Sequence, residues 1–288
     1  MKRLIVNADD FGLTRGVNRG IVHAHREGIV TSATIMANGE AFEDAVELAR
    51  ANPSLGVGVH IVLMGGRAIA AREKLGGLVD KNGNLLGSFT GIGITFLDAF
   101  TRSSHLEAEM RAQIERVLNA GITPTHLDTH KHLHCNIWIL ESLARVAEEY
   151  RIFKIRMPFE NLRGAFRNGG ARGLQAAARR GFVLASRLAY PAFLHVARRK
   201  KMRMPDDFFG FVGTGQMNRD GILKIIQHLP EGTSELVTHP GICDADLKRQ
   251  PTRLREQRTE ELAALTDPFV IRETAARQVQ LISYRELN

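Results

Sequence analysis

The feature that most limits how this chain can fold is a regular alternation of strand-like and helix-like segments. Short runs rich in apolar and β-branched residues lie at 3–8, 31–39, 55–63, 125–132, 153–158, 234–241 and 279–287. Amphipathic segments with apolar spacings of three and four lie at 17–28, 41–53, 106–120, 137–150 and 252–265. Strands that alternate with helices form right-handed βαβ units around a parallel sheet. The chain is therefore predicted to be α/β, and its 288 residues suit one β/α barrel or two smaller domains. The glycine-rich residues 65–93 predict a long loop with a small hairpin.

Polar residues follow many of the predicted strands. They are Asp9, Asp10, Asn38, His60, Asp128, His130, Arg156 and His239. In a β/α barrel, the carboxyl ends of the strands form the active-site face. We therefore expect these side chains to gather at one end of the molecule.

Asp10, His60 and His130 form a candidate metal site. One carboxylate and two imidazoles from three strand ends, with an open position for water, are typical of a catalytic divalent ion. This set suits Zn²⁺ and would accept Mn²⁺, Fe²⁺ or Co²⁺. The neighbouring Asp9 would stay free to take a proton from water that the metal acidifies. That division of roles explains why two mutually repelling carboxylates are adjacent.

Structural roles are the alternative for each of these residues. A lone histidine at a strand end is usually hydrogen-bonded, and an Asp pair is usually a solvated turn or a helix cap. Four histidines within nine residues are rarely structural, and here they are His126, His130, His132 and His134. A third possibility, between structural histidines and a catalytic site, is that this cluster alone scavenges metal ions. Spacing does not choose between His130, His132 and His134 as the ligand.

The formal net charge of +8 is concentrated in one segment. Residues 161–205 contain eleven Lys and Arg and no Asp or Glu, and subtracting these eleven charges from +8 leaves −3 elsewhere. We predict a basic insertion at about 161–211. It is either a solvated helical excursion packed on the barrel or an amphipathic element that contacts an anionic membrane through 163–204. In the second case the side chains toward lipid are Phe182, Leu184, Leu188, Tyr190 and Phe193, and an apolar channel mouth is extended by Phe208, Phe209 and Phe211.

Nucleic acid is the competing partner for such a basic segment. The segment has few aromatic residues for base stacking, and the chain has no recognised nucleic-acid module. We therefore expect no nucleic-acid partner. No signal peptide or membrane-spanning run is predicted, and the two cysteines, Cys135 and Cys243, form no CxxC pair. A reduced, cytoplasmic compartment is expected, with a single disulfide left open.

Five motifs resemble the YdjC-like carbohydrate deacetylases, in order and over essentially the whole chain. They are "VNADDFGLTRGVNRGI", "GIVTSATIMANG", "GVGVHIVL", "PTHLDTHKHLH" and "ELVTHPG". Within the family, the chain looks most like the branch associated with hopanoid biosynthesis, through "MANGEAFEDAVELARANPSLGVGVHIVLMGGRA" and the basic insertion. The resemblance implies one domain, residues 1–288, folded as a distorted (β/α) barrel of the glycoside hydrolase/deacetylase type.

The resemblance also implies roles for individual residues. Asp10, His60 and His130 would ligate one divalent metal ion, with Zn²⁺ favoured and Mg²⁺, Mn²⁺ or Co²⁺ as alternatives. His134 is the second choice of ligand. Asp9 would be the catalytic base and His239 the acid that protonates the leaving amine, while Asp128 would orient a ligating histidine. Arg156 and Asn38 are candidates for substrate binding, and an ordinary ion pair is the alternative for Arg156.

The implied reaction is hydrolysis of the N-acetyl group of an N-acetylglucosamine-type sugar. By resemblance to the hopanoid branch, the sugar would be carried on a hopanoid, and the protein would lie on the inner face of the cytoplasmic membrane. The alternatives are a deacetylase of soluble chitooligosaccharides and a catalytically silent barrel that binds a sugar or lipid. A homo-oligomer is left open.

Overall fold

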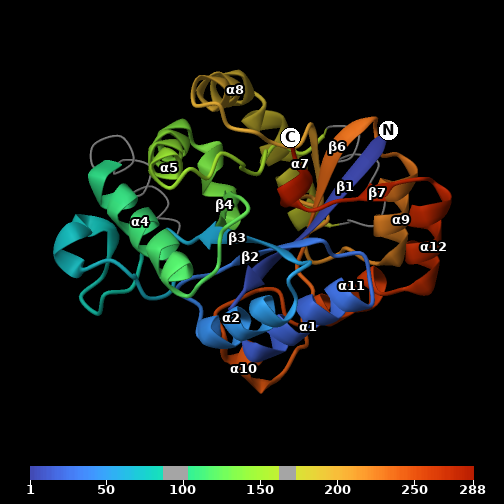
Figure 1. Ribbon diagram of the computed structural model, residues 1–288, viewed down its shortest axis with the longest axis horizontal. Helices are drawn as coiled ribbons and strands as arrows, with labels where there is room; N and C mark the ends of the chain where they lie inside the picture. The colour runs from blue at the N-terminus through green and yellow to red at the C-terminus, as the bar shows by residue number, and fades with distance from the viewer. Residues whose placement is uncertain (87–102, 162–172) are drawn as a thin grey trace.

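The protein folds around a parallel sheet that curls into part of a barrel (Figure 1). The computed structural model describes residues 1–86, 103–161 and 173–288, and all statements below concern these residues. The sheet order is β4-β3-β2-β1-β6-β5, and β7 pairs with the start of β1. The strands are β1 (Lys2–Phe11), β2 (Ser32–Ile35), β3 (Gly56–Ile61), β4 (Leu127–Thr129), β5 (Asp207–Phe209), β6 (Gly232–Thr238) and β7 (Gln280–Leu281). Every pairing between them is parallel, which confirms the predicted α/β class.

The two edges of the sheet approach each other across residues 153–161. Ile155 bridges Leu127 of β4, and Lys154 bridges Arg203, which precedes β5. The Asn161 N–H then donates to the Phe208 carbonyl at 3.0 Å. We predicted a regular strand at 153–158, but the structure has only isolated bridges there. Pro158 has no N–H to donate to a ladder, so the closing segment stays irregular and the barrel is distorted.

Helices surround the curled sheet (Figure 1). They are α1 (Arg15–Arg26), α2 (Phe42–Ala51), α4 (Ser103–Asn119), α5 (Ile137–Glu149), α7 (Leu174–Ser186), α8 (Tyr190–Arg199), α9 (Arg219–Gln227), α10 (Ala245–Arg249), α11 (Glu256–Leu265) and α12 (Pro268–Ala276). Some of them pack on other helices, such as α8 on α5. Side chains start several of them: Thr14 caps α1, Asn136 caps α5 and Asn218 caps α9. The sequence prediction missed α9, α10 and α12 as well as β5. Each has nine residues or fewer, too short for a clear period.

The middle strands are buried on both faces, as expected for a parallel sheet between helices and a filled interior. In β1 every residue from Leu4 to Phe11 is buried, and β3 is buried throughout. One large apolar cluster joins these strands to the inner faces of the helices. The polar residues at the strand ends are therefore attached to a rigid scaffold.

The glycine-rich segment after β3 contains short 3₁₀ turns, at Arg72–Lys74 and Gly76–Leu78. Antiparallel bridges join Arg67 to Asn84 and Val79 to Leu85, in agreement with the predicted hairpin. The remainder of that predicted loop, 87–93, lies outside the described residues.

The basic segment forms two helices, α7 and α8, and β5 lies within the range predicted as an insertion. Three exposed apolar side chains agree with the amphipathic prediction: Phe182 is 48% exposed, Leu184 is 51% exposed and Leu188 is 89% exposed. Phe193 was predicted to face lipid, which is wrong, because it is 1% exposed and packs on Phe159. Phe208 and Phe209 are buried, and residues 162–172 of the segment lie outside the described residues.

Two further observations concern membrane-spanning segments and the cysteines. None of the described helices is long and apolar enough to cross a membrane. Cys135 and Cys243 are free thiols rather than a disulfide.

Candidate metal centre

The end of β1 departs from a regular strand at Asp9 and Asp10. Successive side chains of a strand point to opposite faces, which would separate the two carboxylates. Here the register between β1 and β2 shifts between Ala8 and Phe11, and Asp10 has a φ of +67°. A bulge of this kind re-aims a side chain. As a result, Asp9 and Asp10 each place an oxygen within 4.8 Å of a ring nitrogen of His60.

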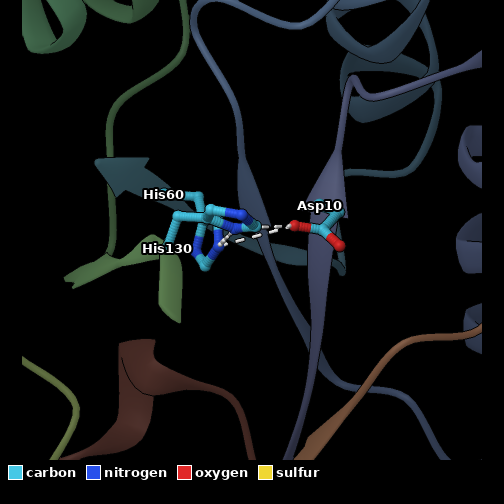
Figure 2. Close-up of side chains that lie close together, drawn as sticks. All are labelled: Asp10, His60 and His130. Atoms are coloured by element: carbon cyan, nitrogen blue, oxygen red, sulfur yellow. Dashed lines mark hydrogen bonds and ion pairs between the residues drawn. The ribbon is translucent and has the colours of Figure 1, made fainter. Parts of the chain in front are cut away.

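Three donor atoms converge at the carboxyl ends of β1, β3 and β4 (Figure 2). Asp10 Oδ1 lies 3.5 Å from His60 Nε2 and 3.4 Å from His130 Nδ1, and the two nitrogens are 3.3 Å apart. Ligands held tetrahedrally at about 2.0–2.1 Å from one ion stand about 3.3–3.4 Å from each other. The buried Asp10 Oδ1 accepts no hydrogen bond from the described residues. Both observations fit a single small divalent cation.

His60 is oriented by Asp128 on the side opposite to Asp10. Its Nδ1 lies 2.6 Å from Asp128 Oδ1, so this nitrogen carries the proton and leaves Nε2 to face Asp10 and His130. Burial disfavours a charged ring, but the carboxylates of Asp128, Asp9 and Asp10 outweigh it and raise the pKa of His60 to about 9. The negative charge around this imidazole favours the binding of a cation beside it.

Asp9 is held by a buried guanidinium. Arg156 donates to both Asp9 oxygens, at 2.8 and 2.6 Å, and also contacts Asp128 at 2.7 Å and Glu235 at 2.9 Å. Burial opposes ionisation of Asp9, but the charge and hydrogen bonds of Arg156 hold the pKa of Asp9 well below its usual value. Arg156 is itself 0% exposed, so its partners in this structure are carboxylates rather than solvent.

Among the clustered histidines, the structure brings His130 to Asp10 and His60. His134 is fully buried, with Nδ1 2.6 Å from Thr129 Oγ1 and Nε2 3.2 Å from the Arg156 carbonyl. His132 packs against Phe208 and Phe211. The separation arises from the turn His130–Cys135, where Lys131 and His132 have φ of +57° and +54° and interrupt any regular alternation.

His239 lies close enough to the centre for the charges of Asp9 and Asp10 to act on it, whereas Asn38 contacts the glycine-rich segment after β3. The backbone N–H of His239 donates to Glu261 Oε1 at 3.0 Å. The ring atom His239 Nδ1 is buried and has no hydrogen-bond partner among the described residues. Burial lowers the pKa of His239 to about 4, against the opposing effect of the Asp9 and Asp10 carboxylates. Asn38 donates to the Arg67 carbonyl at 3.2 Å and keeps an oxygen without a partner in the described part of the chain.

Sequence reasoning missed two side chains on α11 that touch this centre. Arg258, 1% exposed, donates to Asp10 Oδ2 at 2.5 Å, and Glu261 accepts the His239 N–H. Burial raises the pKa of Glu261 to about 8. In the sequence both look like ordinary charged residues of an amphipathic helix. Their spacing of three, on one helical face, was the available signal.

The centre therefore holds buried carboxylates, imidazoles and guanidiniums in one cluster that can bind a cation and move protons. The chain matches the model of the YdjC-like protein family over residues 3–275. It belongs to the YdjC-like family. The resemblance to the family read from the five motifs is thereby confirmed.

Relatives within this family match the whole chain. A carbohydrate deacetylase of Geobacillus stearothermophilus is 37% identical over 284 residues, covering 98% of this chain and 96% of the relative. A carbohydrate deacetylase of Brevibacillus brevis is 33% identical, covering 99% of each chain. A crystal structure from Enterococcus faecalis, named for cellobiose-phosphate cleavage, superposes with a TM-score of 0.78 at 26% identity, covering 99% of this chain and 98% of the other. These matches support the barrel-type fold along the full length.

Proposed function

We propose that this YdjC-like protein is a metal-dependent hydrolase that removes the N-acetyl group from an N-acetylglucosamine-type sugar. The observation that carries the proposal is the convergence of Asp10, His60 and His130 on one point, with Asp9 beside them. Full-length similarity to proteins named carbohydrate deacetylase supplies the substrate class. A binding protein has no evident need for a base, an acid and a metal site together.

Asp10, His60 and His130 would hold the cation, and Zn²⁺ is proposed because one carboxylate and two imidazoles suit it. When bound, such an ion acidifies water and draws electron density from an amide carbonyl. Asp9 would accept the proton of the attacking water. Its low pKa keeps it ionised, and its two hydrogen bonds to Arg156 fix its direction. In this account Arg156 positions the base, in place of the substrate contact predicted from the sequence.

His239 would donate a proton to the departing nitrogen. Its Nδ1 is the candidate atom, because it is buried near Asp9 and Asp10 and has no described partner. The ring is neutral at pH 7 in this structure, so the acid role requires proton uptake when substrate binds. Asn38 is the proposed sugar contact, since its side-chain oxygen is unused by the described residues.

A lipid-linked sugar, such as an N-acetylglucosaminyl hopanoid, is the finer substrate proposal. Sequence resemblance to the hopanoid-associated branch supports it, and so does a row of rings that leads outward from the centre. His132 contacts Phe211, and Phe211 contacts the half-exposed Phe182 of α7, with ring centroids 5.3 and 5.5 Å apart. Exposed Leu184 lies on α7 and exposed Leu188 in the turn between α7 and α8, among arginines. Such a face suits peripheral contact with an anionic membrane.

The test is acetate release by metal-replete protein from an N-acetylglucosaminyl hopanoid in vesicles and, in parallel, from N,N′-diacetylchitobiose. A chelated sample and the Asp9→Asn variant are the negative controls. Release from the lipid, lost in both controls, would support reaction and substrate together. Release from chitobiose alone would assign the protein to soluble chitooligosaccharides. Intact metal binding without release from either substrate would contradict the deacetylase proposal and favour a sugar- or lipid-binding barrel.

The contribution of the helical face is tested with the double variant Phe182→Ser/Leu188→Ser. Both side chains are exposed, so the variant should fold, whereas deletion of α7 and α8 would remove the buried Phe193 and uncover Phe159, on which it packs. If the face contacts the membrane, the variant loses turnover on the vesicle substrate and keeps it on a soluble one. Equal turnover of wild type and variant on vesicles would overturn the membrane part of the proposal.

A further inference from the structure

We infer that Arg258 of α11 is a positioning residue that holds Asp10 in the one orientation that serves the metal centre. The inference rests on the proposed function only for the identity of Asp10 as a ligand. In the described part of the chain, no hydrogen bond or ion pair joins Arg258 to His60 or His130, so it would act through Asp10 alone.

The contact divides the two oxygens of Asp10 between two tasks. Arg258 Nη2 lies 2.5 Å from Asp10 Oδ2, while Asp10 Oδ1 faces His60 and His130 at 3.5 and 3.4 Å. Both side chains are almost fully buried, at 1% and 4% exposure for the residues. A charge-assisted bond in such surroundings is short and directional. With Oδ2 engaged in this way, Asp10 can offer a cation one oxygen.

The backbone of Asp10 makes such a restraint necessary. A φ of +67° is uncommon for any residue other than glycine and costs of order 1–3 kcal/mol. The following turn is closed by the Leu13 N–H to the Asp10 carbonyl at 3.0 Å and by the Gly12 N–H to Asn18 Oδ1 at 2.6 Å. These bonds hold the main chain but leave χ1 and χ2 of Asp10 to its side-chain partners. Among the described residues, Arg258 supplies the one hydrogen bond to Oδ2 that the structure records.

Close packing places Arg258 beside Asp10, although the two residues are far apart in the sequence. A Cβ on Gly241 would meet Arg258 Cδ at 3.2 Å and the Val17 Cα at 3.3 Å. A Cβ on Gly20 would meet the Gly241 Cα at 2.5 Å. The Gly241 N–H also donates to the Arg258 carbonyl at 3.1 Å. The loop that carries His239 is thus pressed between α1 and α11, and side chains at these glycines would push Arg258 away.

The alternative reading is a buried ion pair that stabilises the fold and has no influence on the metal. The two readings differ in what happens to bound metal when the fold survives. Outer partners of metal ligands typically change metal affinity by about 10–100-fold when they are removed. A purely structural pair changes the unfolding temperature and leaves the affinity and coordination of the ion as they were.

The experiment measures Co²⁺ binding to the full-length apoprotein by calorimetry and by the visible absorption of the bound ion. The variants are Arg258→Met and Arg258→Lys, and the matched control is Arg255→Met, an exposed arginine one turn earlier. We expect Arg258→Met to bind Co²⁺ about 10–100-fold more weakly and with a changed spectrum. Arg258→Lys should recover part of the lost affinity and part of the wild-type spectrum, and Arg255→Met should match the wild type in both.

Wild-type affinity and spectrum in a folded Arg258→Met protein would overturn the inference. If Arg258→Met does not fold, the test uses Arg258→Lys, which keeps the buried positive charge, and Gly241→Ala. Wild-type Co²⁺ affinity and spectrum in both of these variants would overturn the inference. Because Co²⁺ binding is measured without a substrate, the inference can hold while acetate release fails. A wild-type protein that binds no Co²⁺ would overturn both the inference and the proposed metal centre.

Discussion

The strand-end centre and the α7–α8 helices carry charge in opposite ways. At the centre, Asp9, Asp10, Asp128 and Arg156 are nearly or fully buried, and all four are paired. On α7 and α8, basic side chains reach carbonyls or partly exposed acids: Arg179 donates to the Val212 and Thr214 carbonyls, and Arg199 pairs with Glu141 of α5. Buried charge must be matched atom by atom, whereas exposed charge is screened by water.

The buried centre and the exposed helices differ in how sensitive they are to substitution. Removing one member of a buried charge pair leaves its partner desolvated, which is costly. Removing an exposed leucine or arginine changes the folding free energy little. Substitutions that change a single atom at the centre should therefore alter stability or activity. Substitutions on the exposed face of α7 and α8 should have an effect only when a membrane or a lipid substrate is present.

The largest expected effect is on turnover in Asp9→Asn. The amide keeps the size of the side chain but removes the base, so we expect kcat to fall by about 10²–10⁴-fold. KM and metal content should change little, because Asp10, His60 and His130 are untouched. Steady-state kinetics with metal analysis tests this. A variant with near-normal kcat would remove Asp9 from the base role.

Arg156→Met should produce the largest loss of stability. It leaves Asp9, Asp128 and Glu235 without their shared cation in a buried site. We expect the free energy of unfolding to fall by about 3–5 kcal/mol, measured by denaturant titration at pH 7. The control is Arg199→Met, whose arginine is about half exposed and should cost less than about 1 kcal/mol. Equal losses would contradict the contrast between the two regions.

Asp128→Asn should weaken metal binding by about 10–100-fold. The carboxylate accepts the Nδ1 proton of His60 at 2.6 Å, and an amide can donate there instead and favour the wrong tautomer. Calorimetric titration of the apoprotein with Zn²⁺ measures the change. Asp207→Asn, at the opposite edge of the sheet, is the matched control. Unchanged affinity would mean that Thr34, whose Oγ1 lies 3.3 Å from His60 Nδ1, and the backbone suffice to orient His60.

The smallest expected effect is that of Leu188→Ala. With 89% of the side chain exposed, we expect a change in unfolding free energy within about 0.5 kcal/mol. Phe193→Ala, on the helix α8 that follows Leu188, should cost about 3–5 kcal/mol because it empties a buried site. Thermal or denaturant unfolding of the pair tests both. A large loss in Leu188→Ala would mean that this face is covered within the protein.

Much of the candidate centre could be predicted because its residues follow strands whose apolar runs are visible locally. The carboxyl ends of β1, β3 and β4 were expected to meet, and Asp10, His60 and His130 do converge there. Spacing could not choose among the histidines, since the choice depends on left-handed residues at Lys131 and His132. Nor did the pattern reveal that Pro158 lies in an irregular closing segment, because the run before it has the composition of a strand.

The sequence by itself determined the parallel α/β architecture, the family and the strand ends at which chemistry gathers, because period, motif order and residue type are local properties of the chain. The tertiary structure alone decided that Arg156 binds the carboxylate of Asp9, that Phe193 faces inward and that Arg258 reaches Asp10 across 248 residues. Those outcomes depend on which surfaces meet when the sheet curls, and on the requirement that each buried charge find a partner. No local pattern carries that information.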